Sequence, residues 1–246
     1  MSNESELMID YLRQVVQQLH KNVGISQNDY TKFGQYYEYL LEVNKTMNLT
    51  RIVDPMEVAA KHFGDALTVY DERIFPKGCR VIDVGTGAGF PGVPLAIILE
   101  ESRFTLLDSL QKRTRFIESA VNNIHLHNIE VVQSRAEDLG RNPQYREKFD
   151  VVLARAVASL NVLSELCLPF LKTGGYFLAM KGPKAMDEIE SARKAIQVLG
   201  GGTVSIESCK LPLVEEDRII ICIEKVRHTP MLYPRKAGIP ERDPLK

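Results

Sequence analysis

The chain has 246 residues, of which 44% are hydrophobic, so it can bury the core of an α/β domain and still carry an added segment. Its 31 Lys and Arg residues nearly balance its 32 Asp and Glu residues, and the net charge of -1 excludes a globally basic protein. The four cysteines lack metal-ligand spacing and no apolar run is long enough to cross a bilayer. We therefore expect a cytoplasmic protein with no metal and no membrane contact.

Residues 1–72 have the periodicity of a helical cap. Apolar residues recur at three- and four-residue steps, Ser26 and Asp29 resemble a capping box, and Pro55 suits the first position of a third helix. Four aromatic residues with helical spacing are expected to pack in the core rather than to stack on bases. They are Phe33, Tyr36, Tyr37 and Tyr39.

Two polar features of the cap have alternative interpretations. Residues 44–51 form either an ordinary loop or a lid that faces a site. His62 and Asp65 stand one turn apart on the third helix, where they could meet a substrate. Their spacing favours a pair with each other.

Residues 80–92 predict a buried strand, a glycine-rich turn and the start of a helix. The β-branched residues suit a central parallel strand, and Gly85, Gly87 and Gly89 let the backbone bend sharply and approach a ligand. The alternative is a turn that only links the strand to the helix.

Strand and helix signals alternate after this loop, which predicts a doubly wound parallel sheet. The expected strands are residues 104–108, 129–133, 149–154 and 176–180, and the expected helices are residues 91–100, 111–124, 159–171 and 184–199. Residues 204–210 and 218–226 are two further strands with no helix between them. They predict an antiparallel hairpin at the sheet edge.

The glycine loop matches the patterns of two cofactors. Read from Gly87, it has the GxGxxG pattern of dinucleotide sites, but the match begins two residues after the strand ends, and a proline follows where a phosphate needs free N–H groups. Read from Asp83, an acid on the strand precedes Gly85, Gly87 and Gly89. This register resembles the first motif of S-adenosylmethionine-dependent methyltransferases.

Three further features favour the methyltransferase. Asp108 ends the second strand, where a carboxylate can accept hydrogen bonds from both ribose hydroxyls. Residues 134–138 follow the third strand, where such enzymes hold the adenine. The terminal hairpin completes a seven-stranded, Rossmann-like class I methyltransferase sheet. We therefore expect that fold over residues 73–246, with S-adenosylmethionine as the cofactor.

Two methylation chemistries lack their motifs here. Methylation of exocyclic amines uses an Asn/Asp-Pro-Pro-aromatic motif after the fourth strand, where this chain has Leu153, Ala154, Arg155 and Ala156. Methylation at pyrimidine carbon needs a cysteine nucleophile, whereas Cys167 lies in an apolar helix. Ring nitrogens, ribose hydroxyls and small molecules remain. An atom such as guanine N7 has a free lone pair and no proton to remove, so its methylation needs no general base. Positioning of the two reactants could then supply most of the catalysis.

Several runs together resemble one known family: residues 47–50, 62–65, 83–94, 105–110 with Lys112 and Arg113, 135–137, 155–156 and 233–238. They resemble the glucose-inhibited division protein B family, which comprises bacterial N7-guanine methyltransferases of 16S ribosomal RNA. The resemblance covers nearly the whole chain and implies the same reaction.

The resemblance also implies roles for individual residues. Gly85 and Phe90 would line the cofactor cradle, Asp108, Ser109 and Leu110 would hold the ribose side, and Ala136 and Glu137 would border the adenine. Arg155 would reach the cofactor or the guanine, because a guanidinium can hydrogen-bond guanine O6 while leaving N7 open. Its alternative is an ion pair with Asp83 or Glu137. Lys181, after the fifth strand, is a second candidate catalytic residue for the cleft.

Ribosomal RNA would be bound mainly through its phosphates. Residues 225–246 contain six Lys or Arg and two acids, a net charge of +4 on a body that carries -5. Arg235 and Lys236 are therefore RNA-binding candidates, with Arg113 in a second contact, although a tail that is merely solvated is the alternative. We expect a monomer acting on small-subunit ribosomal RNA or its particle. The alternatives are a methyltransferase of this fold for another RNA site or a small molecule, and a nucleotide-binding module without catalysis.

Overall fold

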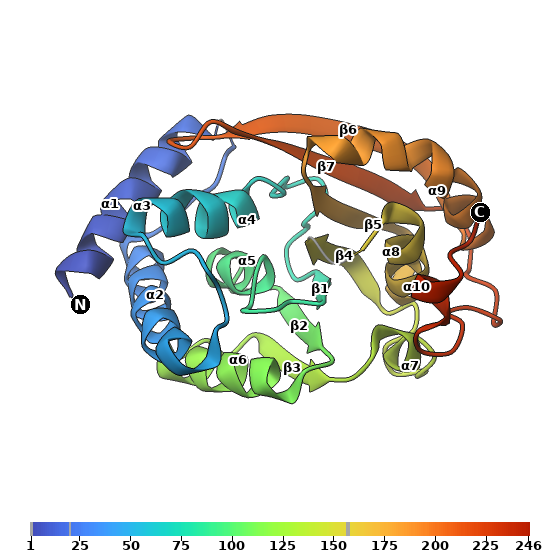
Figure 1. Cartoon of the computed structure of the whole chain (residues 1–246), viewed down its shortest axis with the longest axis horizontal. Helices are drawn as coiled ribbons and strands as arrows, with labels where there is room; N and C mark the ends of the chain where they lie inside the picture. The colour runs from blue at the N-terminus through green and yellow to red at the C-terminus, as the bar shows by residue number, and fades with distance from the viewer. Residues whose placement is uncertain (1, 20, 156–157) are drawn as a thin grey trace.

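A computed structural model describes residues 2–19, 21–155 and 158–246 (Figure 1). In these ranges seven strands form one sheet in the order β3-β2-β1-β4-β5-β7-β6. The strands are β1 (Arg80–Val84), β2 (Arg103–Asp108), β3 (Ile129–Gln133), β4 (Phe149–Arg155), β5 (Leu171–Lys181), β6 (Gly201–Leu211) and β7 (Glu216–Lys225). The first five run parallel, and β7 lies antiparallel between β5 and β6. The predicted parallel body and terminal hairpin are confirmed.

Helices cover both faces of the sheet. One face carries α1 (Asn3–Gln18), α2 (Gln27–Met47), α3 (Pro55–Val58), the π-helical turn η1 (Ala59–Gly64), α4 (Asp65–Leu67), α5 (Gly92–Ile98) and α6 (Gln111–Asn123). The other carries α7 (Ala136–Leu139), α8 (Leu160–Cys167) and α9 (Met186–Val198), with α10 (Ile239–Arg242) beside α8. Figure 1 shows the N-terminal helices and the α8 to α10 group at opposite ends of the molecule.

Alternate residues of each central strand enter two separate hydrophobic cores. Val81 of β1 joins the core beneath the N-terminal helices, whereas Ile82 and Val84 join the core beneath α8 and α9. Leu106 and Leu107 of β2 divide in the same way. A parallel sheet that is buried on both faces explains why these strands read as continuous apolar runs.

The cap helix α2 begins and packs as its sequence predicts. The Ser26 hydroxyl accepts the Asp29 N–H, and the Asp29 carboxylate accepts the Ser26 N–H, which makes a complete capping box. The aromatic stripe of this helix belongs to the core, because the side chains of Phe33, Tyr36 and Tyr37 are fully buried.

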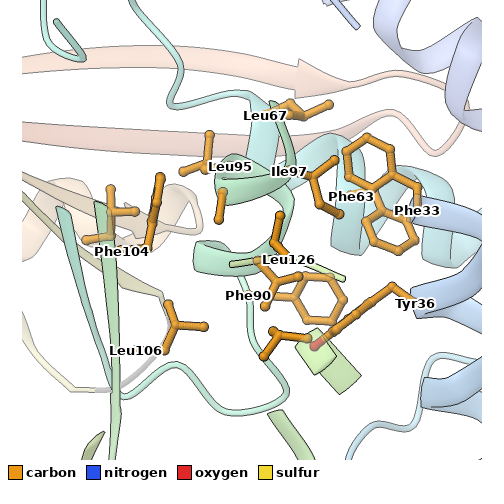
Figure 2. Packing of buried hydrophobic residues seen from close by; sticks show 14 of the residues in the cluster. Phe33, Tyr36, Phe63, Leu67, Phe90, Leu95, Ile97, Phe104, Leu106 and Leu126 are labelled. Atoms are coloured by element: carbon orange, nitrogen blue, oxygen red, sulfur yellow. The ribbon is translucent and has the colours of Figure 1, made fainter. Parts of the chain in front are cut away.

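Tyr36 joins the cap to the glycine loop. Its ring packs edge-on against Phe63 and Phe90, and Figure 2 shows these rings together in the core. Its hydroxyl donates a hydrogen bond of 2.7 Å to the carbonyl oxygen of Ala88. The cap therefore supports the wall of the site described below.

Some predicted boundaries differ from the observed ones. The third helix, which begins at Pro55 as predicted, is not a continuous α-helix: a π-helical turn interrupts it and α4 ends at Leu67. The helix predicted for residues 159–171 ends at Cys167, and a short 3-10 turn, Leu168–Phe170, follows. Pro169 explains this end, because it cannot donate to a continuing α-helical ladder.

Candidate functional site

A cavity of about 560 Å³ lies at the carboxyl ends of β1 to β4. The strand order reverses between β1 and β4, which is where doubly wound sheets bind ligands. Its volume suits a nucleoside-sized ligand. The walls include Val84, Gly85, Thr86, Gly87, Ala88, Phe90, Leu107, Asp108, Ser109, Ala136, Glu137 and Arg155.

The glycine loop forms one wall of this cavity. Gly85, Gly87 and Gly89 have φ angles of 76°, 63° and 83°, a left-handed conformation that glycine adopts without strain. Gly85 and Gly87 line the cavity, as predicted. Gly89 is not among the lining residues: a Cβ at this position would collide with the Tyr36 hydroxyl, so Gly89 admits the cap instead.

Asp83 lies behind the loop rather than on the cavity wall. Its fully buried carboxylate accepts the Thr86 hydroxyl at 2.7 Å and the Gly92 N–H at 2.9 Å, both on Oδ2. Burial raises the pKa of Asp83 to about 6. Asp83 holds the loop in shape and is not among the lining residues, and its role in cofactor binding stays a prediction.

Asp108 lines the cavity at the end of β2. Its Oδ2 accepts the Gly87 N–H at 3.0 Å and its Oδ1 accepts the Leu110 N–H at 2.9 Å. The Arg113 guanidinium lies 3.2 Å from Oδ2, and both Ser109 and Arg113 line the cavity. Leu110 contributes this N–H, but its side chain is not among the lining residues. Oδ1 keeps acceptor capacity for a hydroxyl of a bound ligand, whereas Oδ2 already accepts both Gly87 and Arg113.

Ala136 and Glu137 line the cavity from the start of α7, as the sequence predicts. Oε1 of the buried Glu137 accepts the Gly238 N–H at 2.8 Å. Pro240 and Glu241, on α10, line the same cavity. Sequence reasoning missed these two residues, because nothing local in the tail indicates that it returns to this wall.

Leu49 and Thr50 reach the cavity from the segment between α2 and α3. Asn44 holds them there: its Oδ1 accepts the N–H groups of Leu49 at 2.6 Å and Thr50 at 2.9 Å, and its amide donates to the Thr50 carbonyl at 2.9 Å. Of the two interpretations of residues 44–51, the structure supports the segment that faces a site.

His62 and Arg155 both contact the ring of Phe90. The His62 ring stacks on Phe90 with centroids 4.6 Å apart, and the Arg155 guanidinium carbon lies 5.2 Å from the Phe90 centroid. Burial, assisted by the charge of Arg155, lowers the pKa of His62 to about 3. The imidazole is therefore neutral near pH 7, and its Nε2 lies 2.9 Å from the Thr50 hydroxyl oxygen.

The predicted pair of His62 with Asp65 is wrong among the described contacts. Asp65 instead binds two arginines: its Oδ2 accepts Arg155 Nη1 at 3.0 Å and its Oδ1 accepts Arg218 Nε at 3.1 Å. The cause is the π-helical turn between α3 and α4, whose wider i→i+5 winding changes the direction of side chains three residues apart. His62 faces Phe90, and Asp65 faces the two guanidinium groups.

The alternative interpretation of Arg155, an ion pair with Asp83 or Glu137, is not seen within the described structure. The Asp83 and Glu137 carboxylates are held by backbone and hydroxyl groups on other elements. Arg155 binds Asp65 and, through the same Nη1, the carbonyl oxygen of Lys61 at 3.3 Å.

A second cavity, of about 890 Å³, shares His62, Arg155 and Ala158 with the first. Lys181 lines only this second cavity, and its Nζ donates to Glu188 Oε2 at 2.6 Å and to the Ala158 carbonyl at 2.7 Å. The structure thus brings Lys181 near Arg155 but commits its charge to Glu188.

The basic tail is less available than its net charge suggests. The Arg235 guanidinium binds Glu165, whose side chain is 1% exposed, with its Nη2 2.6 Å from Oε2. Lys225 is fully buried, and burial lowers its pKa to about 8. Of the RNA-binding candidates, Lys236 is exposed and Arg113 is shared with Asp108. The Arg235 guanidinium is thus held in an internal ion pair, and its contact with RNA stays a prediction.

Within residues 2–19, 21–155 and 158–246, no three His, Cys, Asp or Glu side chains gather where they could hold a metal ion. No helix in the same ranges combines the length and apolar character needed to cross a membrane. Ala156, part of the motif after the fourth strand, lies outside the described residues.

Comparison with known proteins agrees with this geometry. A family model described as GidB, rRNA small subunit methyltransferase G, matches residues 29–220. A ribosomal RNA small subunit methyltransferase G from Lactobacillus acidophilus is 47% identical over 227 residues, which are 91% of this chain and 94% of that protein. A protein of the same name from Alkaliphilus oremlandii is 46% identical over 237 residues, 96% of this chain and 98% of that protein.

Solved structures support the fold alone, because their sequences are distant. A SAM-dependent O-methyltransferase from Thermotoga maritima is 16% identical, with a TM-score of 0.51 over 78% of this chain and 73% of that chain. The fibrillarin pre-rRNA processing protein of Methanococcus jannaschii is also 16% identical, with a TM-score of 0.52 over 67% of this chain and 74% of that chain.

Proposed function

The chain belongs to the GidB family of ribosomal RNA small subunit methyltransferases G, and from this premise we propose that it transfers a methyl group from S-adenosylmethionine to N7 of a guanine in 16S ribosomal RNA. One observation carries the assignment of chemistry to this site: the nucleoside-sized cavity and a second cavity have His62, Arg155 and Ala158 in common as lining residues. A cofactor in the first cavity and a base in the second would meet at these residues.

The residues of the first cavity suit S-adenosylmethionine, which supplies an electrophilic methyl group on its sulfonium. Asp108 can accept a ribose hydroxyl on Oδ1, whose partner in the structure is the Leu110 N–H. The left-handed glycines let the backbone approach the methionine part. Ala136, Val162 and Leu166 offer an apolar surface to the adenine.

Arg155 is placed to orient the guanine. Its recorded hydrogen bonds, to Asp65 and Lys61, both use Nη1. In the described structure its Nε and Nη2 groups therefore stay available to donate to guanine O6, a contact that leaves N7 accessible. Asp65 fixes the direction of the fork, so we assign it a positioning role.

The reaction at N7 needs no proton transfer, so it needs no general base. His62 has a pKa of about 3 and a hydrogen-bonded Nε2, so its contribution is a neutral ring that packs on Phe90 and lines both cavities. Positioning of the base against the methyl group can contribute about 7–11 kcal/mol to lowering a barrier of this kind.

We propose in addition that residues 1–72 act as the cap, that residues 73–246 carry the reaction, and that the chain works as a monomer.

A methylation assay tests the proposal. The purified chain is incubated with labelled S-adenosylmethionine and either naked 16S ribosomal RNA or the small subunit, and 7-methylguanosine is mapped by its selective chain cleavage. We expect label at N7 of a guanine. Label at another atom, or none on either substrate, would refute the assignment.

The role of Arg155 has its own matched test. Arg155→Lys keeps the charge but loses the fork, so it should lower kcat at least tenfold. Arg73→Lys alters an arginine whose side chain is 86% exposed and should leave kcat unchanged. Equal rates for the two variants would remove Arg155 from the proposed site.

A further inference from the structure

The C-terminal segment returns to the cavity that we assign to the cofactor. Figure 1 shows α10 beside α8 and near α7, although α10 is the last helix of the described chain. Pro240 and Glu241 of α10 line the cavity together with Ala136 and Glu137 of α7. The tail therefore contributes to the wall of a site whose other parts come from residues 49–166.

An internal ion pair fastens the start of this segment. The backbone N–H and Nε of Arg235 both donate to Glu165 Oε1, at 2.8 and 2.9 Å, and Nη2 donates to Oε2 at 2.6 Å. Glu165 lies on α8 and its side chain is 1% exposed. Since a buried carboxylate needs such partners, the pair anchors the tail.

Two arginines after α7 bind the tail through its carbonyl groups. Arg146 donates to the Thr229 carbonyl at 2.7 Å and to the Tyr233 carbonyl at 2.8 Å. Arg141 donates to the Pro234 carbonyl at 2.8 Å. Hydrogen bonds from charged donors are the stronger class, so the path of the tail is fixed well before α10.

Gly238 then turns the chain into α10. Its φ of 80° is in the left-handed region, and its N–H donates to Glu137 Oε1 at 2.8 Å. The turn buries Pro240 and leaves the Glu241 carboxylate at the cavity edge. The Glu137 carboxylate thus holds the C-terminal segment against the cavity through this hydrogen bond.

We propose that residues 238–241 are part of the S-adenosylmethionine site, in which Pro240 and Glu241 border the adenosine end of the ligand. Pro240 supplies apolar surface, and Glu241 supplies an acceptor for the amine and hydroxyl donors of an adenine nucleoside. The tail thus determines the affinity for the cofactor in addition to any contact that it makes with RNA. This inference rests on the cofactor part of the proposed function and is independent of the RNA substrate.

Binding of S-adenosylhomocysteine, measured by calorimetry, tests the inference without catalysis. A chain that ends after Lys236 keeps the Arg235–Glu165 pair and should bind at least tenfold more weakly. The double variant Pro240→Ala/Glu241→Ala should bind at least threefold more weakly, and Lys77→Ala, at a side chain that is 78% exposed, should bind as the unaltered chain does. If the shortened chain does not fold, the double variant alone tests the inference. A decrease in affinity of less than threefold in the double variant overturns it.

Hydrogen exchange gives a second readout on the unaltered chain. Bound S-adenosylhomocysteine should slow amide exchange in residues 237–243, and unchanged exchange there would overturn the inference. An unaltered chain that binds no S-adenosylhomocysteine would refute the proposed cofactor site itself. A chain that binds this ligand but methylates no ribosomal RNA would refute only the proposed reaction.

Discussion

Replacement of Asp65 by Asn perturbs the ion pair that holds Arg155 between the two cavities. The Asp65 side chain is 5% exposed and accepts Arg155 at 3.0 Å and Arg218 at 3.1 Å. Asn keeps the shape but removes the charge, and it can offer only one oxygen to the two arginines. Asp65→Asn should therefore destabilise the fold and release the Arg155 fork together.

The size of the loss follows from the exposure of the partners. Breaking a buried ion pair costs about 3–5 kcal/mol. The side chains of Arg155 and Arg218 are 19% and 22% exposed, so water replaces part of the lost interaction when Asp65 is changed. We expect Asp65→Asn to lower the free energy of unfolding by about 2–3 kcal/mol.

Urea denaturation measures this loss, and Asp150→Asn is the matched control. Asp150 pairs with Lys172 at 2.9 Å and accepts the Arg80 N–H at 2.8 Å, which the Asn oxygen can still accept. The side chains of Asp150 and Lys172 are 31% and 44% exposed, so the loss should stay below about 1 kcal/mol. In the folded Asp65→Asn variant, kcat for RNA methylation should also fall at least tenfold. Equal destabilisation by the two substitutions would refute the reasoning.

Three further predictions concern pH, packing and the tail. The unfolded chain protonates His62 near its ordinary pKa of 6.5 whereas the folded chain does so near 3, so the stability that His62 contributes is present above pH 6.5 and is lost as the pH falls. Urea titrations at pH 7.5 and 5 should show the unaltered chain losing more stability than His62→Gln, and equal losses would contradict this. Gly92→Ala would place a Cβ against Leu106, with Asp83 Oδ2 2.9 Å away, and should lower the free energy of unfolding, measured by thermal denaturation, by about 1–3 kcal/mol. A Cβ at Gly182 meets open space, so Gly182→Ala should leave the stability unchanged. Arg235→Ala leaves the buried Glu165 carboxylate without its charged partner and should lower the free energy of unfolding in urea by about 3–5 kcal/mol. Adding Glu165→Leu should restore most of this stability. If the second change restores none of it, the ion pair is not the cause of the loss.

The parts of the structure that sequence could predict are those set by nearby residues. The capping box needs only Ser26 and Asp29, and the glycine loop needs only a strand followed by residues that tolerate positive φ. Asp108 was placed correctly because parallel strands end at one edge of a sheet, so an acid there must approach the loop after β1. Apolar runs predict the bounds of β2, β3 and β4 to within one residue, whereas β5 begins at Leu171, five residues before its predicted start.

The errors arise where partners are distant in sequence or where local winding is unusual. Asp65 and Arg218 are 153 residues apart, and no periodicity relates them. The π-helical turn after α3 has no signal in composition, yet it redirects His62 and Asp65 and so alters the partners of Arg155. Glu137 and Gly238 are 101 residues apart, which is why the tail could not be placed on the cofactor cavity.

The internal use of arginine also changes where RNA binding should be sought. A positive tail was read as a phosphate contact from its net charge, but Arg235 is neutralised by Glu165 and Lys225 is buried. Only cations that remain hydrated and exposed can exchange counterions with RNA phosphates, and Arg227, Lys236, Arg242 and Lys246 are exposed in the described tail. Their replacement should reduce the dependence of RNA affinity on salt. The replacement of Arg235 should instead lower the stability of the fold and leave the salt dependence of RNA affinity unchanged. This dependence therefore distinguishes a cation that contacts RNA from one that is held in an internal ion pair, although both carry the same charge.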